Sequence, residues 1–586
     1  MRYSPSVTKA RLNRHIRYEP DDPCPPLVTL GVAFQGVVLI LANTVLMVTI
    51  IVRAAGEGEV YLAWAVFAAL VIAGITTALQ AAHVGRVGAG HILMTGAGPH
   101  FIAISVVALT EADLATLASL IVVSSLFQFA MAAWLPFLRR IVTPIVAGTA
   151  LMLIAVAVMP IAVGRLTDVP AGAPEGGGLI AAGVTLAVAT GLVLRAAGVW
   201  RLWAPLSGIL AGCAAALFLG LYDLRPLAEA SWFDLPDVAA WPGIDLIPDA
   251  RFWALLPVFV IVSVVAAIKT SSDGAVIQQA SARKPRATDF RLVQGALNAS
   301  GVGILLSGIA VTPPVIIYLP SSVSLINLTG VAARGVGYAI GGILFALAFL
   351  PKLTAVLLSV PSPVMGAFLL IIMGLLFVEG IRTVFQDGLD PQKGLVVGVA
   401  LALGVGLESG SVFEGVLGAT WSASLGNGMT IGVLATVLLT GFLELTSPRR
   451  RRLEAELDAA ALPGIDAFLC ELADRSGWND ASRERLRAAG QEALECLLQL
   501  REDREAGKAP RLILFARPGR ETVETEFLVV SEKENIEDHL TYLSERAETP
   551  EESELSFRLL RHYASSVRHR QYHGIEIVTV KVAGSR

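Results

Sequence analysis

The sequence is poor in charge and in cysteine. Only 16% of its 586 residues are charged, whereas 54% are hydrophobic, a balance that no ordinary water-soluble chain of this length shows. The formal net charge of -4 comes without a large basic patch, so nucleic-acid binding is not expected. The four cysteines have neither CxxC nor Cys/His spacing, which argues against a zinc site and a disulfide framework. We therefore expect lipid to be the solvent for most of the chain, and no metal or cofactor.

What the sequence has instead is a series of long apolar runs between about residues 27 and 445. Residues 1–23 are polar and basic, and no short apolar stretch with a cleavage site precedes the first run, so no cleavable signal peptide is expected. Each ordinary run has roughly 17 to 25 residues, enough for a helix to cross a hydrocarbon core. The twelve ordinary runs lie near residues 27–53, 59–81, 113–134, 141–164, 178–196, 203–221, 252–272, 290–310, 335–350, 356–378, 393–408 and 429–446.

Two further apolar segments are short and broken. Residues 94–109 read MTGAGPHFIAISVVAL and residues 311–328 read VTPPVIIYLPSSVSLINL, each joining Gly- or Pro-rich backbone to a half-length helix. Irregular backbone is tolerated at membrane depth only where protein or a watery cavity covers it. The two segments stand third in the first seven spans and third in the second seven. This predicts an all-α membrane protein of about fourteen spans in two inverted seven-span repeats, with a binding site between the halves.

Loop charges give an expected orientation. Lys and Arg gather in alternate loops, most densely in residues 283–291, whereas the loop at about residues 222–251 is rich in Asp. By the positive-inside bias the basic loops and both termini are cytoplasmic, in a bacterial-type inner membrane. The Arg run at 449–452 is interpreted as a stop and orientation signal, with attraction to anionic lipid as a secondary effect.

From about residue 453 the composition becomes that of a soluble domain. The pattern predicts a helix at 481–504, strands at 511–517 and 522–531, a helix at 552–568 and a last strand at 575–582. We therefore divide the chain into an N-terminal tail (residues 1–24), a transmembrane domain (25–447) and a small cytoplasmic α+β domain (448–586).

Four stretches carry a resemblance to a known family. They are LRRIVTPIVAGTALMLIAVAVMPIAVG (138–164), FLPKLTAVLLSVPSPVMGAFLLIIMGLLFVEGIR (349–382), LQAAHVGRVGAGHILMTGAG (79–98) and LTGVAARGVGY (328–338). Across roughly residues 25–447 the chain resembles the nucleobase-ascorbate transporters, also called nucleobase:cation symporter-2, which include xanthine, urate and uracil permeases. The resemblance implies fourteen spans in two inverted repeats, a core and a gate domain, transport and no enzymatic reaction, and commonly a homodimer.

The chain departs from this family where the solute usually binds. Family members typically carry a Glu in the eighth span, followed four residues later by Asp or His; Lys269 and Asp273 match these positions. In the tenth span the usual Glu or Gln followed by Asn is replaced by Ser321 and Ser322, or by Pro320 and Ser321 in the other register. An ammonium offers three donors and no acceptor, so Lys269 favours an anionic ligand. The alternative is an internal ion pair between Lys269 and Asp273 at i,i+4.

Other candidate ligand contacts also have a structural alternative. Ser321, Ser322 and Ser324 can present hydroxyls to an anion or can serve as small residues in helix packing. His100 can couple transport to pH or can be satisfied by neighbouring backbone. Phe101 matches the third segment of the family, which faces the substrate, and Gln35 matches a recurrent Gln in the first span that binds ligand or packs helices.

The C-terminal domain faintly resembles the histidine-kinase-like ATPase fold of anti-sigma kinases, through residues 485–500 and 557–567. Cys496 stands where that family has an Asn for magnesium, and no DxGxG loop follows, so we expect a regulatory or interaction module that does not hydrolyse nucleotide. For the whole chain we predict secondary transport of a nucleobase-like or related anionic solute, with H+ or Na+ left open as coupling ion. The alternatives are a receptor that binds solute without transporting it, and an anion exchanger of the same architecture.

Overall fold

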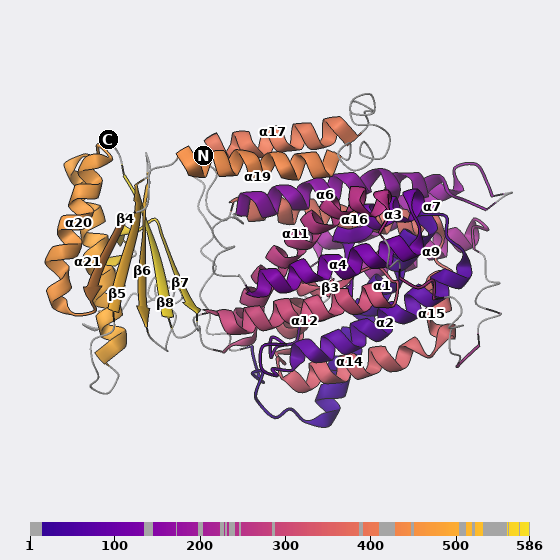
Figure 1. Ribbon diagram of the computed structural model, residues 1–586. Coiled ribbons are helices and arrows are strands. Elements are labelled where there is room, and N and C mark those ends of the chain that lie inside the picture. Colours follow the sequence, from indigo (N-terminus) through magenta and orange to yellow (C-terminus); the bar gives the residue numbers. More distant parts are fainter. Residues whose placement is uncertain are drawn as a thin grey trace. The chain divides into compact units, whose positions relative to one another are not determined.

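The computed structural model describes residues 15–133, 144–170, 173–196, 203–222, 228, 231–233, 241–244, 248–283, 288–385, 391–408, 428–446, 451–502, 511–518, 522–530, 559–560, 562–572 and 575–584. The chain divides into two compact units (Figure 1). We call the range Tyr18–Ile277 with Leu292–Glu444 the membrane unit. The sheet unit takes the described residues of Met1–Arg17, Gln278–Arg291 and Leu445–Arg586.

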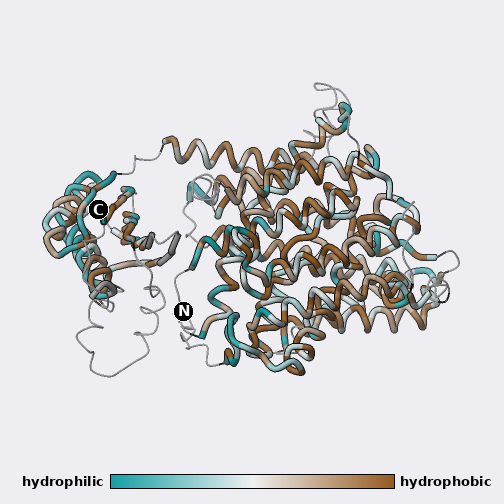
Figure 2. Tube along the Cα trace, turned by 60° about the horizontal axis from the view of Figure 1, so that its bottom comes forward, coloured by the Kyte–Doolittle hydropathy of each residue, from teal (hydrophilic) through white to brown (hydrophobic). Residues whose placement is uncertain are grey.

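The membrane unit is built of helices, and hydrophobic residues cover most of their length (Figure 2). The full-length and shorter helices are α1 (Pro26–Ala54), α2 (Glu59–Ala81), α3 (Ile102–Glu111), α4 (Leu114–Ala133), α6 (Pro144–Gly164), α7 (Gly177–Arg195), α9 (Ala204–Phe218), α11 (Ala250–Ser281), α12 (Phe290–Ile309), α13 (Leu319–Thr329), α14 (Arg334–Ala348), α15 (Pro351–Leu358), α16 (Ser362–Phe385), α17 (Pro391–Glu408) and α19 (Gly428–Thr446). The last residues of α11 and the first of α12 belong to the sheet unit.

Eight helices in the described part of the chain are long and apolar enough to cross a membrane, or up to nine if α14 and α15, which meet at 85°, form one bent span. The protein is therefore a multi-pass membrane protein. The apolar stretches of α3, α9, α17 and α19 are shorter, so length and composition alone leave the predicted count of fourteen undecided.

Within the membrane unit the helices pack in two groups. In the first group α14 lies along α2 and both contact α1, while in the second α16 lies along α6 and also contacts α7 and α9. Glycines permit the close approach in both groups. A Cβ added at Gly341 of α14 would lie 2.5 Å from the Gly74 carbonyl of α2, and one at Gly380 of α16 would lie 2.7 Å from the Gly148 carbonyl of α6. Small residues at such contacts are the usual basis of helix association in membranes.

The two broken segments pair with each other. Strand β1 (Thr95–Ala97) leads through a 3-10 turn (Pro99–Phe101) into α3, and strand β3 (Val315–Ile317) leads into α13. The strands are antiparallel, with Gly96 opposite Ile316. Every residue of both strands is buried. The irregular backbone expected at both places is thus present, and its hydrogen bonds are satisfied within protein.

Strand β1 is also fixed to α2 by threonine hydroxyls. The Thr95 Oγ1 lies 2.6 Å from the Thr76 hydroxyl and 2.9 Å from the Thr77 hydroxyl, and it donates to the Ala73 carbonyl at 3.0 Å. These bonds satisfy polar groups that would otherwise be costly at membrane depth.

The sheet unit contains a six-stranded sheet with the order β2-β7-β8-β6-β5-β4. Its strands are β2 (Thr288–Asp289), β4 (Arg451–Glu456), β5 (Arg511–Pro518), β6 (Thr522–Val530), β7 (Ser566–Tyr572) and β8 (Ile575–Ala583). All pairings are antiparallel except that of β2 with β7. Helices α20 (Leu462–Arg475) and α21 (Asp480–Glu502) lie on one face (Figure 1) and share a buried core with β5, β6 and β8.

One expectation for this unit needs correction, and two of its features were not predicted. The helix predicted at 552–568 is wrong at its end, because Ser566 begins β7, which pairs along its whole length with β8. Part of that predicted helix lies outside the described residues. Arg451 and Arg452 follow the last span, and they also begin β4, where they pair with Ala516 and Phe515. Helix α20 was not predicted from the sequence.

Candidate functional site

Lys269 and Asp273 form an ion pair on α11. Four residues apart on a helix, their side chains lie on one face. The Lys269 Nζ donates to both carboxylate oxygens of Asp273, at 3.1 and 3.0 Å. The side chains are only 17% and 5% exposed, so both charges are largely removed from water. The ammonium has three donors and Asp273 takes two, which leaves one for another acceptor.

Charges on other elements act on this pair. The carboxylate of Glu379, on α16, interacts electrostatically with Asp273. Lys269 in turn interacts with His100, which lies between β1 and α3. The ion pair is therefore electrostatically linked to the first broken segment and to the second helix group.

His100 and Phe101 are buried at the start of α3. Their exposed fractions are 2% and 0%. Neither imidazole nitrogen of His100 has a hydrogen-bond partner among the described residues, and no side chain caps the N-terminus of α3. The alternative expectation, that neighbouring backbone groups bond the His100 imidazole, is therefore wrong for the described residues. A buried polar group without a partner is costly, so water or a polar ligand is expected to meet this ring.

The serines of α13 differ in what they bind. The Ser322 Oγ accepts the Met94 N–H at 2.9 Å and donates to the Tyr318 carbonyl at 3.2 Å. This buried hydroxyl ties the first broken segment to the second, which is a structural use. Ser321 and Ser324 are half-buried, and no hydrogen bond between them and the other candidates is found in the described part of the chain.

A further polar group lies on α1, beside the paired strands. Asn43 is 7% exposed, and neither its amide nitrogen nor its amide oxygen has a hydrogen-bond partner in the described ranges. It lies beside the Tyr318 hydroxyl, although the two do not reach hydrogen-bond geometry. The neighbouring Thr44 is packed against β1, because a Cβ added at Gly96 would lie 2.3 Å from its Oγ1.

Asn43 could have been found from the sequence. An Asn in the middle of an apolar span is a functional candidate by the same reasoning that selected Lys269. Tyr318 gives a weaker signal, because a Tyr next to a Pro-rich break is also common in packing. Gln35, which was predicted, is an exposed residue of α1, and no contact brings it to the other candidates within the described ranges. No cluster of metal-ligating side chains occurs among the described residues.

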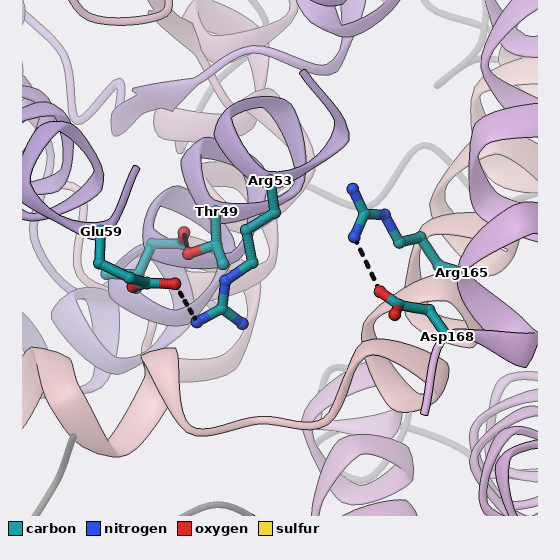
Figure 3. Close-up of polar contacts among 6 residues, drawn as sticks. Thr49, Arg53, Glu59, Arg165 and Asp168 are labelled. Carbon is teal, nitrogen blue, oxygen red and sulfur yellow. Dashed lines mark hydrogen bonds and ion pairs between the residues drawn. The ribbon is translucent and has the colours of Figure 1, made fainter. Parts of the chain in front are cut away.

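Two of the other ion pairs of the membrane unit lie at helix ends and are drawn in Figure 3. Arg53 and Glu59 meet at 3.3 Å between the end of α1 and the start of α2, and Arg165 and Asp168 meet at 3.0 Å after α6. Their acidic partners are 69% and 52% exposed, so these pairs remain in contact with solvent. Exposed ion pairs contribute little to stability. The pair of Lys269 and Asp273 thus differs from these two pairs in being buried.

The model of the Permease family (Xan_ur_permease) matches residues 28–412, from α1 to just beyond α17. The chain belongs to this permease family. The match includes every element that carries a candidate residue, namely α1, the two broken segments with α3 and α13, and α11. As a permease the protein is a transporter and not an enzyme, and membership favours transport over the receptor alternative.

The alignments with individual relatives cover most of each relative's length. The uric acid permease PucK of Bacillus subtilis is 27% identical over 56% of this chain and 75% of its own. The xanthine permease XanP of Escherichia coli is 24% identical over 68% and 88%. The nucleobase transporter PlUacP of Paenibacillus larvae is 24% identical over 74% and 98%.

Among solved structures, the transmembrane domain of a cyanobacterium bicarbonate transporter, BicA, aligns with a TM-score of 0.45 and 14% identity. The alignment covers 70% of this chain and 97% of that chain.

Proposed function

We propose that this permease carries a purine-type nucleobase in its anionic form across the membrane, with Lys269 as the main solute contact. Permeases named for xanthine, uric acid and nucleobases are its relatives, and oxopurines lose a proton more readily than other nucleobases. The observation that carries the proposal is the buried Lys269 ammonium, with one donor left beyond its bonds to Asp273. A charge-assisted bond to a ligand anion is stronger than a neutral one.

The neutral groups around the paired strands complete the proposed site. His100, Asn43 and Tyr318 each hold polar atoms without a hydrogen-bond partner in the described residues, and together they offer both donors and acceptors. A heterocycle with alternating N–H and C=O groups at its edge has complementary chemistry. Phe101, Ser321 and Ser324 adjoin these groups in sequence and are proposed to line the same site, and Gln35 is proposed as a peripheral contact.

We propose that a proton accompanies the anion. When a solute anion binds the remaining donor of the Lys269 ammonium, one positive charge faces two negative ones, so the Asp273 carboxylate no longer has a counter-ion to itself, and Glu379 adds a weaker negative influence. A buried carboxylate without a counter-ion is strongly unfavourable. Protonation of Asp273 removes that charge, so anion and proton enter together. Na+ as the coupling ion is the competing possibility.

The wider architecture is part of the proposal. Fourteen spans in two inverted repeats place α3 and α13 at equivalent positions, and these are the two half-length helices that follow the paired strands. The two helix groups then act as core and gate in alternating access. We further propose a homodimer in a bacterial-type inner membrane with both termini in the cytoplasm, a non-catalytic C-terminal domain from residue 448, and domain limits as given by the sequence.

Uptake into proteoliposomes tests the proposal. With radiolabelled xanthine and uric acid, Lys269→Met should lower transport about 10- to 100-fold, the range expected when a hydrogen bond to a charged group is lost. Lys352→Met, which removes a cation that lies over Trp232, is the matched control and should transport like the wild type. Equal uptake by Lys269→Met and the control would refute the role of Lys269, and absence of uptake by the wild type would refute the substrate class.

A further inference from the structure

One residue other than glycine has a positive backbone φ in the described part of the chain. It is Val311, with φ 52°, the first residue of the second broken segment. The left-handed region costs free energy for any residue with a Cβ, and for a β-branched residue it is a genuine outlier. Such strain persists only where the surrounding structure holds it, and it gathers at functional sites. The groups that hold Val311 are therefore candidates for a functional role.

Val311 ends α12 in a conformation that glycine usually adopts. The Val311 N–H donates to the Gly308 carbonyl at 3.1 Å, and the Thr312 N–H donates to the Ser307 carbonyl at 2.9 Å. These two bonds form a Schellman motif, whose left-handed position is usually a glycine because glycine has no Cβ. The Ser307 hydroxyl also accepts the Val315 N–H at 3.1 Å. The last turn of α12 thus determines where β3 begins.

Three side-chain hydrogen bonds connect this turn to α2. The Tyr61 hydroxyl donates to the Val311 carbonyl at 3.1 Å, and the Trp64 indole N–H donates to the Ala310 carbonyl at 2.8 Å. The hydroxyl of Thr312 donates to a backbone carbonyl of α2 at 2.7 Å. Tyr61 and Val311 are both buried, so solvent does not readily replace the Tyr61 hydroxyl as a donor.

The chain before the first broken segment turns without such strain. Between α2 and β1 the residues with positive φ are all glycines, namely Gly85, Gly88 and Gly90. Glycine adopts these angles at little steric cost. The turn after α12 has a valine instead, and an aromatic hydroxyl bonds the carbonyl of that valine. The conformation of this turn therefore depends on α2 as well as on its own residues.

The turn is connected to both sides of the proposed site. Two prolines follow Thr312, and their rings fix φ. The carbonyl of the second, Pro314, accepts the Gly98 N–H at 3.0 Å, and His100 lies two residues beyond Gly98. In the other direction β3 leads directly to Tyr318. Because this stretch is buried and stiff, a displacement of the turn reaches both His100 and Tyr318.

We infer that Tyr61 is a positioning residue for solute binding, which acts by holding Val311 in its strained conformation. The inference rests on the proposed function, because His100 and Tyr318 are proposed solute contacts. With the hydroxyl bond in place, the second broken segment maintains the spacing of these two groups. Without the bond, Val311 relaxes toward negative φ in a fraction of the molecules. The apparent affinity for solute then falls in proportion to the fraction that remains competent to bind.

Removal of the hydroxyl tests the inference in the full-length protein, by concentration-dependent uptake of radiolabelled xanthine and uric acid into proteoliposomes. Tyr61→Phe retains the ring and removes only the donor. We expect the solute concentration at half-maximal uptake to rise about two- to fivefold, the equivalent of up to one net hydrogen bond, with the maximal rate nearly unchanged. Tyr338→Phe, the same replacement at an exposed position of α14, is the matched control and should behave like the wild type.

Relief of the strain separates positioning from a purely structural role. When Val311→Gly is added to Tyr61→Phe, the turn adopts its left-handed angle without support, so half-saturation should return to the wild-type value. Val311→Ala in the same background retains the Cβ and should not restore it. Should the glycine variant fail to fold, Val311→Asn serves instead, because Asn also tolerates this region. Unchanged half-saturation in Tyr61→Phe, or equal values in the rescue and alanine variants, would overturn the inference.

The strain can also be measured without solute. At an ordinary position glycine is less stable than alanine, but at a positive φ the order is reversed. Thermal unfolding in detergent should therefore show Val311→Gly to be more stable than Val311→Ala, and the opposite order would overturn the inference through the strain itself. A wild type that moves neither solute would instead overturn the proposed function, and the positioning role with it.

Discussion

Removal of Lys269 alone should destabilise the protein more than removal of the whole ion pair. The Nζ and the nearer Asp273 oxygen are 3.0 Å apart, and the side chains are 17% and 5% exposed. At an effective dielectric constant of about 20, two unit charges at this distance attract by roughly 5 kcal/mol. Lys269→Met leaves the Asp273 carboxylate buried without this partner, so we expect a loss of about 3 to 5 kcal/mol in the free energy of unfolding.

The double variant Lys269→Met with Asp273→Leu should recover most of this loss, because apolar residues of similar volume replace a buried ion pair at little or no cost. The assay is denaturant-induced unfolding of solute-free protein in detergent, read as a double-mutant cycle. Arg165→Met breaks a pair whose acid is 52% exposed and should cost less than about 1 kcal/mol. The reasoning is refuted if Lys269→Met costs no more than Arg165→Met, or if the double variant is as unstable as the single one.

Three further outcomes follow from packing and burial. Ser322→Ala should cost about 1 to 3 kcal/mol in unfolding experiments, because a backbone N–H of the first broken segment loses its acceptor; Ser321→Ala should not, and equal costs would contradict the assignment. Gly341→Ala should destabilise by about 1 to 3 kcal/mol, since its Cβ would lie 2.5 Å from a carbonyl of α2. The neighbouring Gly342→Ala, which meets nothing within 4 Å, is its control, and equal thermal unfolding of the two would show that the contact is absent. Burial raises the pKa of the Cys496 thiol, and the charges of Glu492 and Glu495 raise it further, so near neutral pH it stays protonated. Iodoacetamide should then label Cys24 before Cys496 in the folded protein, as mass spectrometry can check, and equal rates would count against this burial.

Local patterns in the sequence were sufficient for many elements of the sheet unit. The predicted helix at 481–504 corresponds to α21 (Asp480–Glu502), and the strands expected at 511–517 and 522–531 correspond to β5 and β6. In each of these the alternation or helical spacing of apolar residues is strong within the element itself. The prediction failed where hydrogen bonds to a neighbouring strand decide the secondary structure. Ser566–Tyr572 became a strand because β8 supplies its hydrogen bonds, and the two-residue β2 exists only because β7 lies beside it.

The candidate site was predicted in part. Lys269 and Asp273 could be selected because charges in an apolar span are rare, and their i,i+4 spacing fixes them on one helix face. Spacing could not say whether the two charges pair, which needs the rotamers found in the folded protein. It also could not separate Ser322, whose hydroxyl is used by the backbone, from Ser321 one residue earlier.

By itself the sequence determined that this is a membrane protein with two interrupted helices, and it selected the charges that lie among them. The reason is that each charge or unpaired backbone group placed in lipid has its own free-energy cost. Such residues therefore stand out in an otherwise apolar stretch of sequence. Only the tertiary structure decided which polar groups are satisfied. The Ser322 hydroxyl and the Met94 N–H that bonds it are 228 residues apart, whereas Asn43 and His100 remain without partners among the described residues, and no local pattern encodes a hydrogen bond between such distant segments.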